Sequence, residues 1–104
     1  MDNKPCPEAL LGALGLCRKA GALALGFDAV LQSLKSKQTA LLLFAEDVSE
    51  GTRRRLETAA PSSVEIVVLP CSKQALAALG CKPVGALAVT NAQLARLCLS
   101  KMLV

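Results

Sequence analysis

The sequence has no histidine, tryptophan or tyrosine, and its two aromatic residues are Phe27 and Phe44. Without histidine, the commonest general base is missing, and neither a Ser/His nor a Cys/His nucleophile pair can form. There is also no GxxxxGK(S/T) phosphate loop. The adjacent carboxylates Glu46 and Asp47 fit a solvated turn before a helix better than a catalytic pair. We therefore expect a protein that is not an enzyme.

The cysteines follow no metal-binding or disulfide pattern. They are odd in number, and no two stand two residues apart: Cys6, Cys17, Cys71, Cys81 and Cys98. With histidine absent as well, we expect no metal and no cofactor. Their scatter through apolar segments is typical of small buried hydrophobes in a reducing cytoplasm. Cys17 stands beside two basic residues, which could lower its pKa, but its position on an apolar helical face favours the core.

Long hydrophobic runs are also absent. The longest, Thr39 to Ala45, is far too short to span a bilayer, and the first residues lack the order of a signal peptide. The 104 residues are 53% hydrophobic and 19% charged, which predicts one folded domain. Twelve Lys and Arg against eight Asp and Glu give a net charge of +4, which permits an anionic partner without requiring one.

Helical and strand patterns alternate along the chain. Residues 1–7 are predicted to be a flexible tail, and residues 8–104 a single domain. We expect helices over 8–20, 26–34, about 50–59, 73–79 and after Asn91. Gly21 closes the first helix, Asp47 or Ser49 caps the third, and Ser72 caps the fourth. A short extended piece is expected at 22–25, and buried strands are expected at 40–44, 64–69 and 85–89. This order predicts a three-layer α/β/α sandwich around a mixed central sheet of about four strands.

Two features could bind an anion. Gly26 opens a helix, where unpaired backbone N–H groups and the positive end of the dipole lie, and Lys19, Lys35 and Lys37 can fall near the same edge. The run 53–55 is three consecutive arginines, which is either a solvated outer helix face or a second phosphate-contacting patch. Two phenylalanines cannot form a platform for stacking single-stranded bases, so folded RNA is the better nucleic-acid target.

Several segments in order resemble the kink-turn RNA-binding ribosomal proteins L-seven-Ae and L-thirty-e, especially their small bacterial homologues. They are Leu11-Gly12-Ala13-Leu14, Arg18-Lys19-Ala20-Gly21, Leu25-Gly26, Ala45-Glu46-Asp47-Val48-Ser49, Ala75-Leu76 with Leu79-Gly80, and Val84-Gly85-Ala86-Leu87-Ala88-Val89. The resemblance implies a sandwich that grips a sharply bent RNA duplex, with the first turn of the second helix in the major groove.

The resemblance also implies a set of RNA-binding residues. On the second helix these are Gly26, Phe27, Asp28, Ala29 and Gln32. The loop before the last strand covers an extruded nucleotide and holds Cys81, Lys82, Pro83 and Val84. Glu46 matches a nearby position, and we add Lys19 and Lys35 as phosphate contacts.

The chain departs from the fullest family motif at three positions. The family has Asn, Glu and Lys where this chain has Asp28, Ala29 and Gln32. A lysine can reach the O6 and N7 acceptors of guanine, whereas Gln32 donates without charge and Asp28 cannot donate to O6. The loss of one good base contact predicts RNA binding that is weaker by about 1–3 kcal/mol.

The leading hypothesis is a non-enzymatic, ribosome-associated or ribosomal-protein-like monomer. It would bind structured ribosomal or untranslated RNA in the cytoplasm, with no membrane or DNA partner. One alternative is a protein-interaction module on the same fold whose RNA site has decayed. Another is an accessory domain of an RNA-modifying enzyme, although the chain ends without a cofactor-binding domain.

Overall fold

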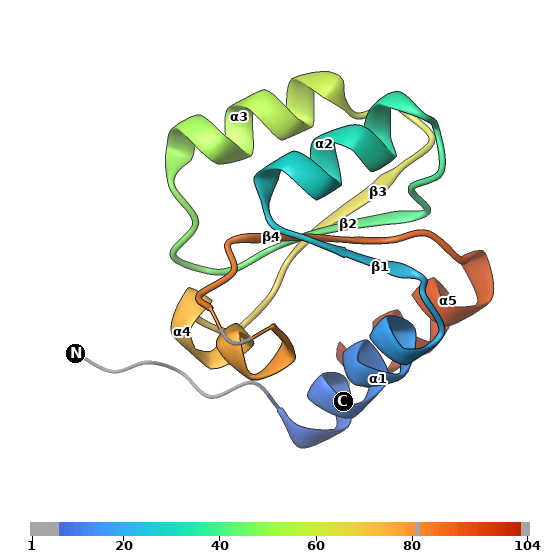
Figure 1. Ribbon diagram of the computed structural model, residues 1–104, viewed down its shortest axis with the longest axis vertical. Coiled ribbons are helices and arrows are strands. Elements are labelled where there is room, and N and C mark those ends of the chain that lie inside the picture. Colours follow the sequence, from blue (N-terminus) through green and yellow to red (C-terminus); the bar gives the residue numbers. More distant parts are fainter. Residues whose placement is uncertain (1–6, 81, 103–104) are drawn as a thin grey trace.

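Four strands form one mixed sheet at the centre of the computed structural model, which describes residues 7–80 and 82–102 (Figure 1). The strands are β1 (Leu23–Leu25), β2 (Leu41–Phe44), β3 (Glu65–Val68) and β4 (Ala86–Val89). Their order is β1-β4-β2-β3, with β2 and β3 parallel and the other two pairs antiparallel. The predicted mixed sheet of four strands is confirmed.

Helices cover both faces of this sheet. They are α1 (Glu8–Lys19), α2 (Phe27–Lys35), α3 (Glu50–Ala59), the short α4 (Lys73–Leu76) followed by the 3-10 turn η1 (Ala77–Leu79), and α5 (Ala92–Met102). Helices α2 and α3 lie on one face, and α1, α4 and α5 lie on the other (Figure 1). The predicted three-layer α/β/α sandwich is therefore confirmed.

Alternate residues of the central strands feed two separate cores. Leu41 and Leu43 of β2 pack with Leu10 and Leu14 of α1, whereas Leu42 and Phe44 pack with α2 and α3. All four β2 residues are fully buried, as expected of a strand covered on both faces. The side-chain period of two in a strand is what divides a single apolar run between the two layers.

The turn between α1 and β1 depends on glycine. Gly21 has a φ of +72°, which is the left-handed conformation that glycine adopts without strain. Its N–H donates to the Arg18 carbonyl, and the Ala22 N–H donates to the Cys17 carbonyl. This pair of bonds is a Schellman motif, so the predicted helix stop at Gly21 is confirmed.

The prediction that 64–69 forms a buried strand is wrong. β3 is the edge strand, paired only with β2, and Ile66 and Val68 are 38% and 42% exposed. Helix α3 covers β2 on this face and leaves the outer part of β3 in solvent. The apolar run correctly indicated a strand, but its position at the sheet edge depends on strand order, which local sequence does not encode.

No helix in the described ranges is long and apolar enough to cross a membrane.

Candidate nucleic-acid interface

Helix α2 starts without a side-chain cap. Gly26 precedes it with a φ of +92° and a ψ of 166°, a combination that is essentially restricted to glycine. The first intrahelical bond runs from the Val30 N–H to the Gly26 carbonyl, at 3.0 Å. The N–H groups of Phe27, Asp28 and Ala29 therefore have no acceptor within the helix, and they carry the positive end of its dipole.

The loop at residues 82–85 is held by two neighbouring segments. The Val84 N–H donates to the Lys73 carbonyl at 3.2 Å, and the Ala45 N–H donates to the Gly85 carbonyl at 3.0 Å. The Lys73 N–H in turn donates to Asp47 Oδ1 at 2.8 Å. These bonds bring the end of β2, the start of α4 and the 82–85 loop together.

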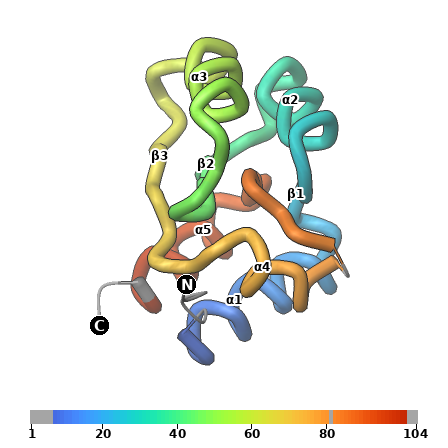
Figure 2. The backbone as a smooth tube through the Cα atoms, turned by 90° about the vertical axis from the view of Figure 1, so that its left-hand side faces the viewer, coloured from blue at the N-terminus to red at the C-terminus, as the bar shows by residue number. Residues whose placement is uncertain are grey.

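The start of α2 lies beside this loop. The Gly26 N–H donates to the carbonyl of Ala86, the residue directly after the loop, at 3.0 Å. Gly80, just before the loop, approaches Leu25 so closely that an added Cβ would lie 3.2 Å from the Leu25 Cδ1. These contacts bring the start of α2 and the 82–85 loop to one edge of the molecule. We call this edge the α2 rim: residues 26–29, Glu46, Asp47, Lys73 and residues 82–85. It faces the viewer in Figure 2.

Most of the predicted RNA-binding residues lie on the α2 rim. Asp28, Ala29, Glu46, Lys82 and Pro83 are exposed there, and Gly26 and Phe27 are half-buried. Cys81 lies outside the described residues. The rim therefore combines backbone donors from α2 with side chains from two other segments.

Other predicted residues lie elsewhere. Gln32 and Lys35 continue along the exposed face of α2, with Lys35 about 12 Å from its first residue at 1.5 Å per residue. Lys19 lines a groove between α1 and η1, with Gly12, Gly15 and Ala78. These lysines can act only as outlying contacts.

Val84 does not offer its side chain to a ligand. It is only 6% exposed and packs into the core beneath α1 and α4. The expectation that it covers an extruded nucleotide with apolar atoms conflicts with this burial. Its part in the rim is to hold the loop in place through its N–H bond to Lys73.

Lys73 is a rim residue that the sequence did not single out. Its side chain is half-buried, and its Cδ atom lies 3.4 Å from the position that a Cβ on Gly85 would take. The sequence does place Lys73 at the start of a helix, because Ser72 is predicted to cap α4 and Lys73 follows it. The sequence does not predict that Asp47, 26 residues earlier, accepts a hydrogen bond from the N–H of Lys73 at this helix start.

Asp47 and Ser49 were alternative caps for α3, and the structure separates them. The Ser49 hydroxyl accepts from the Thr52 N–H at 3.3 Å and is the cap. Asp47 instead tethers α4. The structural reading of Glu46 and Asp47 as a turn before a helix agrees with these contacts.

The rim carries charges of both signs. Lys73 and Lys82 are balanced by Asp28, Glu46 and Asp47. Attraction of a polyanion here consequently depends on backbone N–H groups and on the placement of individual cations, rather than on a uniformly basic surface.

Two thiols on the opposite face of the sheet are buried in the core. The Cys17 and Cys98 sulfurs lie 3.6 Å apart in the core between α1 and α5. Burial, and after it the neighbouring Cys17 thiol, raise the pKa of Cys98 to about 12. Burial likewise raises the pKa of Cys17, so the idea that Arg18 and Lys19 lower it is wrong.

The strand order, the two helix layers and the glycine-opened α2 beside the 82–85 loop define an L-thirty-e-like α/β/α sandwich. The model of the ribosomal protein L7Ae/L30e/S12e/Gadd45 family matches residues 8–100, so the chain belongs to this family. Comparison with curated proteins gives no significant match.

Two solved structures illustrate the shared fold. A protein of unknown function from Bacillus halodurans superposes with a TM-score of 0.78 at 23% identity, covering 91% of this chain and 98% of the other. The Giardia lamblia 15.5kD RNA binding protein superposes with a TM-score of 0.66 at 18% identity, covering 96% and 92%.

Proposed function

We propose that this protein binds structured RNA without catalysing a reaction, and that it recognises a kinked duplex through the α2 rim. The observation that carries the proposal is the Gly26–Ala86 bond, which sets the uncapped start of α2 beside the 82–85 loop in a chain of this family. The fold shared with a Giardia RNA-binding protein agrees with it.

The chemistry of the rim suits a bent RNA better than a straight one. Three unpaired N–H groups at the start of α2 can donate to phosphate or base oxygens. Because the rim has no uniform positive charge, a straight duplex gains little there from phosphate attraction alone. A kinked duplex brings its backbone and its base edges to the α2 start at the same time, and it therefore makes more contacts there.

Asp28 and Gln32 set the expected selectivity. Both are exposed on α2, and Asp28 can accept a hydrogen bond from a base amino group but repels phosphate. We propose that binding is of moderate strength, that the partner is ribosomal or untranslated RNA in the cytoplasm, and that the protein acts as a monomer.

The test compares a kink-turn RNA with an unkinked duplex of the same composition. We expect tighter binding to the kinked RNA and a fall in affinity with rising salt, because phosphate contacts release counterions. Lys82→Glu should weaken binding to both RNAs alike, whereas Asp28→Asn should increase the preference for the kinked RNA. Equal affinity of the wild type for both RNAs at moderate salt would show that kink recognition is wrong.

A protein-interaction module is the competing function. Capture of partners from a cell lysate, with and without ribonuclease treatment, separates the two. Partners lost on treatment support RNA binding, and partners that survive it support the alternative.

A further inference from the structure

The three consecutive arginines of α3 point in different directions. Successive side chains of an α-helix are about 100° apart, and Leu56 marks the inward direction because it is fully buried. Arg54 therefore points away from the sheet, while Arg53 and Arg55 lie on opposite flanks of the helix. Helix α2 lies beside α3 (Figure 2), and Arg55 is on the flank that faces α2, because its guanidinium lies over the ring of Phe27 in α2.

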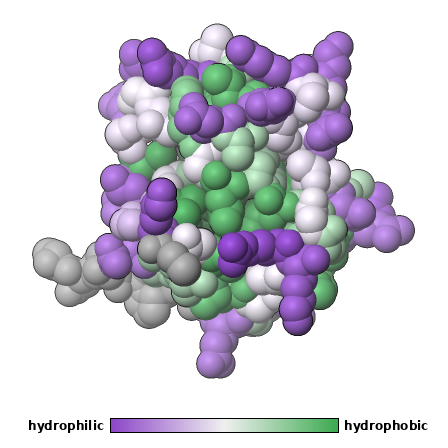
Figure 3. Space-filling view, in the orientation of Figure 1, coloured by the Kyte–Doolittle hydropathy of each residue, from purple (hydrophilic) through white to green (hydrophobic). Residues whose placement is uncertain are grey.

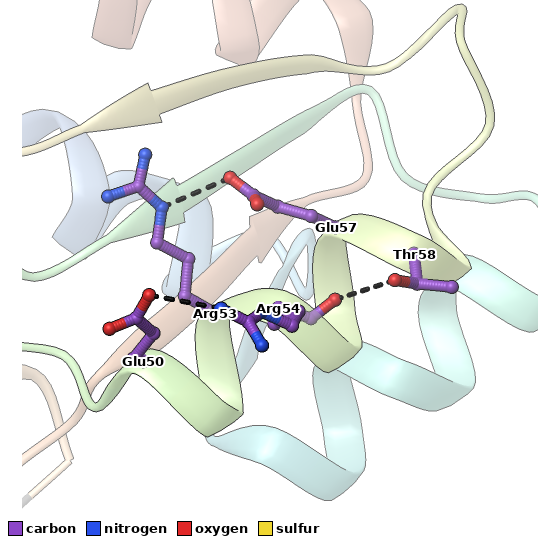
Figure 4. Close-up of polar contacts among 5 residues, drawn as sticks. All are labelled: Glu50, Arg53, Arg54, Glu57 and Thr58. Atoms are coloured by element: carbon purple, nitrogen blue, oxygen red, sulfur yellow. Dashed lines mark hydrogen bonds and ion pairs between the residues drawn. The ribbon is translucent and has the colours of Figure 1, made fainter.

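Arg53 and Arg54 are both engaged by carboxylates of their own helix (Figure 4). Arg53 Nε donates to Glu57 Oε2 at 3.0 Å, and Arg54 donates to Glu50 Oε2 at 3.2 Å. Arg53 also lies over the buried ring of Phe44, at 5.9 Å from its centroid. Two of the three arginines are thus paired with carboxylates of α3 itself.

Arg55 has a different partner. Its guanidinium carbon lies 5.8 Å from the centroid of the Phe27 ring, and in the described part of the chain it forms no ion pair with a carboxylate. Phe27 is the first residue of α2 and lies on the α2 rim. A guanidinium over an aromatic ring is held in place while its in-plane N–H groups can still bind an anion.

Arg55 consequently flanks the start of α2 from α3, a different element from the 82–85 loop. The loop is joined to this start through the Gly26–Ala86 bond, and Arg55 is joined to it through the Phe27 ring. A bent duplex seated on the start of α2 extends its backbones to either side. Lys82 is exposed on the loop, and Arg55 is exposed on α3.

We infer that Arg55, positioned by Phe27, binds a phosphate of the RNA arm that passes over α3, and so extends the binding surface from α2 onto the third helix. The inference rests on the proposed RNA-binding function. It adds a contact that does not read sequence, because phosphate contacts position a duplex and base contacts specify it.

The test measures affinity for the kinked RNA and for the unkinked duplex over a range of salt concentrations. Arg55→Gln should weaken binding and lower the slope of log affinity against log salt by about 0.9, the value for one lost phosphate contact. Arg55→Lys should restore the slope, because it retains the charge, but not the full affinity, because it loses the planar stacking.

Arg54→Gln is the matched control, with the same change one residue away on the outward face. It should leave the slope close to that of the wild type. Equal slopes for Arg55→Gln and Arg54→Gln, or no change in either, would overturn the inference while leaving RNA binding by the wild type intact. Failure of the wild type to bind either RNA would overturn the proposed function and the inference together.

Unfolding midpoints of the variants show whether a loss of RNA affinity comes from a loss of stability. Should Arg55→Gln fail to fold, Phe27→Leu provides the second test, because it removes the ring and leaves the charge. We then expect weaker binding with the slope retained, and unchanged affinity would contradict the positioning role of Phe27.

Discussion

The two helix layers of this protein differ in their polar groups. The layer of α1 and α5 closes its side of the sheet with leucines and thiols, and Cys17 and Cys98 lie there fully buried. The layer of α2 and α3 holds both aromatic rings, each beneath an arginine, and it starts α2 with unpaired backbone donors. One sheet thus separates a layer that stabilises the fold from a layer that can meet a ligand.

The outer surface reflects this division. Figure 3 shows hydrophilic side chains over the upper layer, where α2 and α3 lie, and hydrophobic surface across the middle of the molecule. Changes in the buried core of the α1 layer should therefore alter stability alone, and changes at the α2 rim should alter RNA binding.

The largest expected effect is on the α1 layer. Leu14→Ala removes a fully buried side chain and should lower the free energy of unfolding by about 2–5 kcal/mol. Chemical denaturation measures this loss. Leu16→Ala is the control, since Leu16 is 48% exposed in the same helix and should change stability by less than about 0.5 kcal/mol. Altered RNA selectivity in folded Leu14→Ala would contradict the division between the layers.

The next effect is at the start of α2. Gly26→Ala should cost about 1–3 kcal/mol of stability and weaken RNA binding, because alanine does not tolerate this backbone conformation. No atom crowds the site, so the cost is purely conformational. Gly12→Ala is the matched control, with open space and a helical backbone, and should stabilise the protein by about 0.5–1 kcal/mol. Similar results for both glycines would contradict the account of Gly26.

A smaller effect is expected at the start of α3, where the cap is a side chain. Ser49→Ala removes the acceptor for the Thr52 N–H and should cost about 1 kcal/mol. Thermal unfolding measures the cost. RNA affinity should stay unchanged, since this helix start is already satisfied within the protein. Loss of RNA binding as large as that of Gly26→Ala would remove the distinction between the two helix starts.

The smallest effect at neutral pH concerns the Cys98 thiol, because stability varies with its ionisation only above about pH 9. Burial raises the pKa of Cys98 to about 12 from an ordinary value of 9.0, so the folded state holds this proton more tightly than the unfolded state. The resulting stability is fully present below pH 9 and is lost as pH rises toward 12. Cys98→Ala should reduce this part of the pH dependence in denaturation curves. An unchanged pH profile in the variant would show that the thiol ionises equally in both states.

Helical periodicity predicted much of this architecture. The helical spacing of Leu10, Leu11, Leu14 and Cys17 predicted the apolar face of α1, and all of these but the partly exposed Leu11 are fully buried. Gly21 and Asn91 marked helix ends that the structure confirms. These signals are local, because each depends on residues within one or two turns of the helix.

The features that the sequence did not predict are all non-local. The exposure of β3 depends on strand order, and the burial of Val84 depends on how its loop enters the sheet. The contact of Arg55 with Phe27 joins residues on two helices. At the interface, the resemblance located the helix start and the loop. The place of Lys73, and which arginine of the run 53–55 lies beside α2, depend on contacts between distant segments.

The bond between Gly26 and Ala86 consists of main-chain atoms only. The starting point of α2 is thus independent of which amino acids follow on its exposed face. Residues 28, 29 and 32 are accordingly free to be exchanged at little cost to folding. A library randomised at these three positions would keep one scaffold while varying the RNA that it recognises, which makes the protein a suitable starting point for engineered RNA readers.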